Sequence, residues 1–128
     1  TEFCDMCTAY DDLPGALKLE LAGKTALHDF NRFWEMMRAR PGSTRPPLSE
    51  AQRNAKPPVS HPVVLTHPIS KRKVLYANPG YTVRINELPE AESARTLALL
   101  FDHQTRNKYR YVFHWQVGDV LVWDNRCV

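Results

Sequence analysis

The chain has 128 residues, of which 43% are apolar, a length and composition that fit one globular domain. Its formal charge of +3 comes from basic residues dispersed along the chain, which argues against nucleic-acid binding. No apolar run approaches the roughly 20 residues of a membrane span, and no signal-peptide pattern opens the chain. Ten prolines and five glycines argue against an all-helical bundle and for many short elements joined by turns.

The cysteines indicate the compartment. Their odd number argues against a disulfide framework and for a reducing cytoplasm. Cys4 and Cys7 form a C-x-x-C pair, but no second pair or close histidine pair follows to complete a zinc site. We therefore expect these two cysteines to lie on the first turns of a helix without a metal.

The first third of the chain predicts alternating short elements. A strand end at residues 1–4 enters a helix, residues 16–22 resume helical spacing, and residues 24–30 read as a strand. His28 and Asp29 are adjacent on that strand, so their side chains point to opposite faces and cannot chelate one ion. His28 is predicted to be a hydrogen-bonded structural histidine.

The middle of the chain is a helix followed by a long irregular segment. Residues 31–40 form an amphipathic helix that carries Phe33 and Trp34, an aromatic pair that is usually part of a core. Residues 41–60 are rich in Pro, Ser, Arg and Asn and are predicted to be a flexible loop or lid, with one helical segment capped by Ser49.

A hairpin follows. Residues 61–68 read as one strand, and after a turn the chain returns over residues 73–78. His61 and His67 share a face of the predicted strand but would lie about 20 Å apart along it. They cannot share a metal and are not predicted to form a site.

The last third contains a helix and two predicted strands. Residues 88–104 are an amphipathic helix with an apolar stripe, and residues 109–115 alternate as a strand with four aromatic residues on one face. Such a face could stack on bases, although packing against a core is commoner. Gly118 and Asp119 make a turn, and residues 120–123 read as a short buried strand that ends in a polar Asp-Asn-Arg cluster.

Two blocks carry a family resemblance over nearly the whole chain. Asn-Pro-Gly-Tyr-Thr-Val-Arg-Ile at residues 78–85 and Gly-Asp-Val-Leu-Val-Trp-Asp-Asn-Arg-Cys-Val at residues 118–128 resemble the taurine dioxygenase and 2,4-dichlorophenoxyacetate dioxygenase family. These are Fe(II)- and 2-oxoglutarate-dependent oxidoreductases. The resemblance implies a mainly β fold with helical decoration, a double-stranded β-helix or jelly roll. Residues 1–128 would be a single partial domain of it.

The resemblance also implies a reaction. Enzymes of this family hydroxylate a small anionic organic substrate with O2, using Fe(II) and the co-substrate 2-oxoglutarate, which leaves as succinate and CO2. A sulfonate or an aryloxyalkanoate is the implied substrate type. Phe33 stands where taurine-specific members have a small hydroxyl residue, which implies a larger or more apolar substrate. Residues 49–54 resemble the phenoxyacetate branch.

Roles for individual residues follow from the same resemblance. Thr1 would hydrogen-bond 2-oxoglutarate. Tyr81, Trp34 and Phe33 would line the substrate pocket. Five residues would lie around the iron site without binding the metal, the two tryptophans as buried aromatics: Trp115, Trp123, Asp124, Asn125 and Arg126.

None of the three iron ligands is expected within the chain. A His-x-Asp pair would precede Thr1, and the distal histidine would fall two residues beyond Val128. Residues 1–128 alone are therefore expected not to turn over. The alternative is a non-catalytic β-helix module that binds a small anion or a partner protein. The sequence also leaves open whether the protein is a homo-oligomer.

Overall fold

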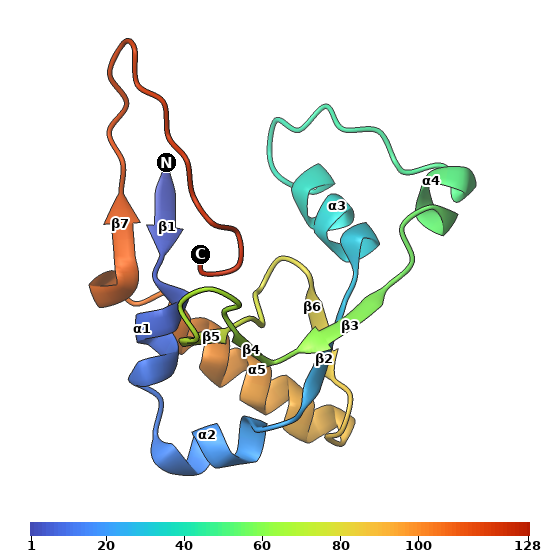
Figure 1. Cartoon of the computed structure of the whole chain (residues 1–128). Coiled ribbons are helices and arrows are strands. Elements are labelled where there is room, and N and C mark those ends of the chain that lie inside the picture. Colours follow the sequence, from blue (N-terminus) through green and yellow to red (C-terminus); the bar gives the residue numbers. More distant parts are fainter.

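The computed structural model describes residues 1–128. Seven short strands, five α-helices and one 3₁₀-helix follow one another along the chain (Figure 1). In chain order they are β1 (Glu2–Cys4), α1 (Met6–Asp11), α2 (Gly15–Leu21), β2 (Thr25–His28), α3 (Phe30–Arg38), α4 (Glu50–Asn54), β3 (Val59–Pro62), β4 (Val64–Thr66), β5 (Lys73–Leu75), β6 (Thr82–Ile85), α5 (Glu90–Gln104), η1 (Asn107–Tyr109) and β7 (Arg110–Val112).

The strands form three small antiparallel sheets. The two ends of the chain meet where β1 pairs with β7, β2 lies between β3 and β6, and β4 pairs with β5. More residues lie in helices than in strands. The prediction of a mainly β chain is therefore corrected for these residues, which form a mixture of helices and small sheets. These strands do not by themselves make a double-stranded β-helix.

The core lies where α1 packs on β5 and α5 packs on β6. Leu75, Ile85 and Leu100 are completely buried there. The apolar stripe predicted for the long helix is confirmed, because Leu97 is buried beside Leu100 and Phe101 packs partly buried against the same cluster. No helix of the chain is both long enough and apolar enough to cross a membrane.

One residue carries the chain from one sheet to the next. Residues 61–68 are not a single strand, as the sequence predicts, because β3 ends at Pro62 and β4 begins at Val64. Between them, the Val63 N–H donates to the Lys24 carbonyl at 2.9 Å, and the Val63 carbonyl accepts from Tyr76 N–H at 2.8 Å. Val63 thus bonds to the residue before β2 and to the residue after β5, and it is completely buried. The hairpin predicted after it is confirmed as β4 and β5.

Side-chain caps fix where two of the middle helices begin. Asp29 Oδ1 accepts the Asn31 N–H at 2.8 Å at the start of α3. The Ser49 cap predicted from the sequence is confirmed at α4, where Ser49 and Gln52 form a reciprocal capping box. α3 carries no fully buried residue, so its aromatic side chains remain available to other segments.

A buried hydrogen-bond network joins the end of α5 to α1. The Tyr109 hydroxyl donates to Asp12 Oδ2 at 3.1 Å and lies 3.1 Å from His103 Nε2, which also lies 2.8 Å from the Ala9 carbonyl oxygen. Tyr109 is therefore buried in η1 and belongs to no strand. The strand predicted over residues 109–115 is reduced to β7, and Tyr109 lies outside it.

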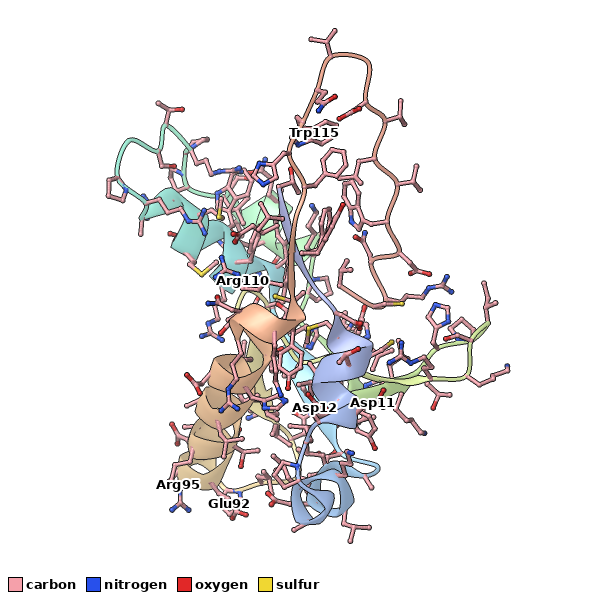
Figure 2. The ribbon with its side chains drawn as sticks, turned by 90° about the vertical axis from the view of Figure 1, so that its left-hand side faces the viewer. Asp11, Asp12, Glu92, Arg95, Arg110 and Trp115 are labelled. Atoms are coloured by element: carbon pink, nitrogen blue, oxygen red, sulfur yellow. The ribbon has the colours of Figure 1, made fainter.

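Residues 113–124 form a long arm that rises beyond β1 and β7 and returns toward the body of the chain (Figure 1). Figure 2 shows Trp115 on this arm, at the far end of the molecule from Glu92 and Arg95 on α5. The buried strand predicted for residues 120–123 is wrong, since Val120 and Val122 are each 87% exposed. A strand is buried only against a neighbour, and no strand of residues 1–128 pairs with this segment.

Candidate functional site

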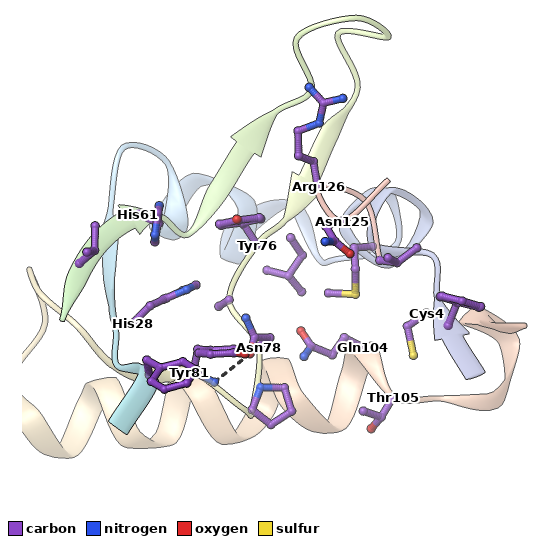
Figure 3. Close-up of a pocket in the computed structure, with 18 of the residues that line it drawn as sticks. Cys4, His28, His61, Tyr76, Asn78, Tyr81, Gln104, Thr105, Asn125 and Arg126 are labelled. Atoms are coloured by element: carbon purple, nitrogen blue, oxygen red, sulfur yellow. Dashed lines mark hydrogen bonds between the residues drawn. The ribbon is translucent and has the colours of Figure 1, made fainter. Parts of the chain in front are cut away.

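The main concavity of the chain is a cleft of about 760 Å³. Its lining comes from β1, β2, β3, the segment between β5 and β6, the C-terminal end of α5 and the last residues of the chain (Figure 3). Half of the lining residues are apolar or aromatic, with polar side chains between them. A cleft of this size and composition is typical of sites for small organic ligands.

His28 occupies one end of the cleft. Thr82 Oγ1 accepts the Asn78 N–H at 2.9 Å and lies 3.0 Å from His28 Nε2, so the threonine hydroxyl joins the histidine to the segment before β6. Burial, and secondly the charge of the neighbouring His61, lowers the pKa of His28 from 6.5 to about 4. His28 is therefore neutral at physiological pH.

Three rings meet at this end of the cleft. His28 stacks on Tyr76 with ring centroids 5.7 Å apart, and the His61 ring lies 4.9 Å from His28 and 5.6 Å from Tyr76. The strand register explains the contact, because Ala26 on β2 faces His61 on β3 and His28 is the next residue on the same face of β2. Sequence reasoning treated the two histidines separately and missed the cluster.

Two of the three predicted substrate residues lie together. The rings of Phe33 and Tyr81 stack with centroids 4.5 Å apart and planes 17° apart. Gly80 permits this approach, because a Cβ added there would lie 3.3 Å from Phe33 Cδ2. Tyr81 lines the cleft, and its N–H donates to Asn78 Oδ1 at 2.9 Å. Phe33 supports the Tyr81 ring without lining the cleft itself.

Trp34, the third predicted substrate residue, faces the segment after α3. Its Nε1 donates to the Pro46 carbonyl at 2.9 Å, and the Arg45 guanidinium lies 4.9 Å from the ring centroid. Trp34 therefore holds part of the predicted loop of residues 41–60, and it is not among the residues that line the cleft.

Thr1 and the two arm tryptophans lie outside the cleft. Trp115 Nε1 donates to Thr1 Oγ1 at 2.9 Å, and Trp123 Nε1 donates to Asn125 Oδ1 at 2.6 Å. The expectation that both tryptophans are buried is wrong, since Trp115 is 55% exposed and Trp123 50% exposed. The Trp123 ring contacts Phe3, with centroids 5.3 Å apart, and the Trp115 ring contacts Phe113, with centroids 5.1 Å apart.

The polar cluster at the end of the chain is built around Asp124. Arg126 donates to it from its backbone N–H at 2.9 Å, from Nε at 2.8 Å and from Nη2 at 2.6 Å, and His67 Nε2 lies 3.1 Å from Oδ2. The hydrogen bonds from Arg126 and then from His67 hold the pKa of Asp124 well below its usual range. Arg126 and Asn125 line the cleft, and no other lysine or arginine does.

His67, Asp124 and Cys127 place three potential metal-ligand atoms within 4.8 Å of one another. The tautomer of His67 argues against a metal there. The Ser70 N–H donates to His67 Nδ1 at 3.1 Å, so Nε2 must carry the ring proton that points to Asp124. A metal at Nε2 would need that proton removed while Nδ1 still faces a donor, whereas metal-bound histidines normally donate from the second nitrogen. The contact is a hydrogen bond from the His67 imidazole to the Asp124 carboxylate.

The comparisons with known proteins agree on one family. The family model described as "Taurine catabolism dioxygenase TauD, TfdA family" matches residues 1–128. The chain is 46% identical over 128 residues to the alpha-ketoglutarate-dependent 2,4-dichlorophenoxyacetate dioxygenase of Burkholderia sp. (strain RASC), covering all of this chain and 41% of that protein.

Solved structures give the same result. A crystal structure of a candidate alpha-ketoglutarate-dependent 2,4-D dioxygenase from Burkholderia xenovorans superposes with a TM-score of 0.83 at 34% identity, over 98% of this chain and 46% of that one. The structure of AAD-2 in complex with Mn(II) and N-oxalylglycine has a TM-score of 0.81 at 29% identity, over 98% and 47%. The chain thus spans less than half the length of the proteins that it matches.

Proposed function

Because this chain belongs to the TauD, TfdA family of dioxygenases, we propose that the whole protein is an Fe(II)- and 2-oxoglutarate-dependent dioxygenase. It would hydroxylate a small organic anion, of the aryloxyalkanoate or sulfonate type, and release succinate and CO2. The observation that carries the proposal is the 46% identity to a 2,4-dichlorophenoxyacetate dioxygenase over all 128 residues. The chain covers 41% of that relative, so activity and substrate are inferred for the whole protein.

The cleft supports an aromatic, anionic substrate. Tyr81, held by Phe33 and the turn at Gly80, offers a flat apolar surface, which suits an aryl ring. Arg126 is the one strongly basic side chain that lines the cleft, but its guanidinium is paired with Asp124, so the acid group of the substrate would be bound mainly by residues outside positions 1–128. Trp34 would act from the neighbouring loop, by holding residues that close over the substrate.

Thr1 is suited to the co-substrate. Its Oγ1 accepts from Trp115 Nε1, which leaves the hydroxyl hydrogen free to donate to a carboxylate. Trp115 would thereby orient the Thr1 hydroxyl toward 2-oxoglutarate. Trp123 and Asp124 would fix the backbone around Asn125 and Arg126 through the hydrogen bonds of the polar cluster.

The metal would be held by residues outside positions 1–128. The one group of three potential ligands in the chain, around His67, does not fit a metal in its present tautomer. When bound, Fe(II) and 2-oxoglutarate would supply the oxidising chemistry with O2. The part played by this chain is to bind and orient the substrate beside them and to limit the access of water.

The direct test is succinate formation by the whole protein. We expect succinate only when Fe(II), 2-oxoglutarate, O2 and an acceptable acid are all present. Phenoxyacetate, its chlorinated derivatives and taurine are the first substrates to compare. A protein that binds these acids but forms no succinate and retains no iron would instead be a non-catalytic anion-binding module.

A further inference from the structure

The last residues of the chain form one wall of the cleft. Asn125, Arg126 and Val128 line it (Figure 3). The chain turns between them, because the Cys127 N–H donates to the Asp124 carbonyl oxygen at 3.0 Å. We call residues 124–127 the Asp124 turn. Its position contributes directly to the shape of the cleft, so whatever holds the turn also holds this wall.

Two hydrogen bonds tie the Asp124 turn to distant segments. At its end, the Cys127 carbonyl accepts the Met6 N–H at 2.9 Å, which links the turn to the start of α1. At its beginning, His67 Nε2 donates to Asp124 Oδ2 at 3.1 Å. The bonds from Arg126 to Asp124 lie within the turn and cannot fix where it lies. Without the bond from His67, the turn would keep one hydrogen-bonded link to the rest of the chain and could pivot about it.

His67 is a rigid anchor, because the turn between β4 and β5 is built around it. Its N–H donates to the Arg72 carbonyl at 2.8 Å, and its own carbonyl accepts the Lys71 N–H at 2.9 Å. Its Nδ1 accepts the Ser70 N–H at 3.1 Å, which orients the ring with Nε2 toward Asp124. The residue is 6% exposed and does not line the cleft. A hydrogen bond from a fixed donor to a carboxylate is among the stronger ones in proteins, so this single bond can hold the turn.

We propose that His67 is a positioning residue for the cleft, which acts through Asp124 on the wall formed by Asn125, Arg126 and Val128. It touches no ligand, and its contribution to binding comes from keeping the wall ordered before the ligand arrives. Ordering part of a site during binding costs affinity, whereas a site that is already ordered avoids this cost. The choice of aryl acids as ligands rests on the proposed function.

Two substitutions of similar length isolate this hydrogen bond. His67→Gln keeps a donor for Asp124 at the end of the side chain, whereas His67→Met has none. Both lose the imidazole acceptor of the Ser70 N–H, so that bond does not contribute to the difference between them. Arg72→Gln is the control, because it breaks an exposed ion pair with Asp11 from the same turn and leaves Asp124 unchanged.

The first measurement follows the Asp124 turn in the whole protein labelled with 5-fluorotryptophan. Trp123 Nε1 donates to Asn125 Oδ1 at 2.6 Å, so the Trp123 fluorine resonance, assigned with Trp123→Phe, reports on the turn. We expect this resonance to shift or broaden in His67→Met and to match the wild type in His67→Gln and Arg72→Gln. The Trp34 resonance should stay the same in all of them. An unchanged Trp123 resonance in His67→Met would overturn the inference.

The second measurement is the affinity for phenoxyacetate and 2,4-dichlorophenoxyacetate, by calorimetry without O2 and well below each melting temperature. His67→Met should weaken binding by at least about fivefold, and His67→Gln by less than about twofold. Equal affinities with a lower melting temperature in His67→Met would mean a purely structural role and would also overturn the inference.

Succinate formation tests the proposed function separately. A working dioxygenase in which His67→Met binds the acids like the wild type would refute only the present inference. If the whole protein binds neither acid and forms no succinate, the proposed function fails, and the Trp123 resonance still decides whether His67 holds the wall of the cleft.

Discussion

Replacing His28 by glutamine tests the buried imidazole directly. Unfolded, His28 has a pKa near its ordinary 6.5, and in the folded chain its pKa is about 4. Between these values the unfolded chain binds more protons, so the free energy of unfolding falls as the pH drops through this window. The loss begins near pH 6.5, is complete below pH 4 and is absent above pH 7. Glutamine can still form a hydrogen bond with the Thr82 hydroxyl but has no proton to gain.

The magnitude follows from the size of the shift. The full difference would correspond to about 3 kcal/mol, but His28 is only half-buried and solvent screens it, so we expect about 1 kcal/mol. Urea unfolding of the wild type and of His28→Gln at intervals from pH 7.5 to 4 gives the difference between their free energies. His114→Gln, in which an exposed histidine is replaced, is the control. If the wild-type and His28→Gln curves run parallel, the reasoning about burial is refuted.

Three further substitutions test packing and hydrogen bonding. Tyr109→Phe removes the hydroxyl that bonds inside the α1–α5 junction and should lower the free energy of unfolding by about 1–2 kcal/mol in urea unfolding, whereas Tyr111→Phe, at an exposed ring, should change it by less than about 0.5. Ser93→Ala removes the buried acceptor of a β6 backbone N–H at 2.8 Å and should cost about 1–3 kcal/mol in the same assay; no measurable loss would mean that the N–H finds another partner. Gly80→Ala would place a Cβ 3.3 Å from Phe33 and should weaken aryl acid binding to the whole protein more than it changes the melting temperature; unchanged affinity would show that the stacked rings do not contribute to the cleft.

The features predicted correctly from the sequence depend on nearby residues. The Ser49 cap needs only Gln52 three positions later, and the apolar spacing of residues 97–101 determines which face of α5 is buried. The β4–β5 hairpin likewise follows from two apolar runs separated by a polar turn. In each case, the groups that decide the structure lie within a few residues of one another.

Two strand predictions were wrong, because each depended on a contact with a distant part of the chain that the local sequence does not reveal. Val120 and Val122 have the composition of a buried strand, but an apolar strand is buried only if another element covers it, and within residues 1–128 none does. The strand prediction at Tyr109 is wrong because this residue does have a distant partner. Its hydroxyl bonds Asp12, nearly a hundred residues earlier in the chain, and this contact holds the ring in η1, outside the alternation of β7.

The residues of the cleft also differ in whether nearby residues or distant segments determine their contacts. Tyr81 could be identified from a contiguous block of residues, because the turn at Gly80 and the bond to Asn78 are encoded together. His28 and His61 meet only because β2 and β3 pair in one register; a shift of one residue would turn one histidine to the other face. The unpartnered Oε1 of Gln104 is even harder to identify from the sequence, because it is defined by the lack of a hydrogen-bond donor around it in three dimensions. The shape and polarity of the cleft therefore depend largely on contacts between segments that lie far apart in the sequence.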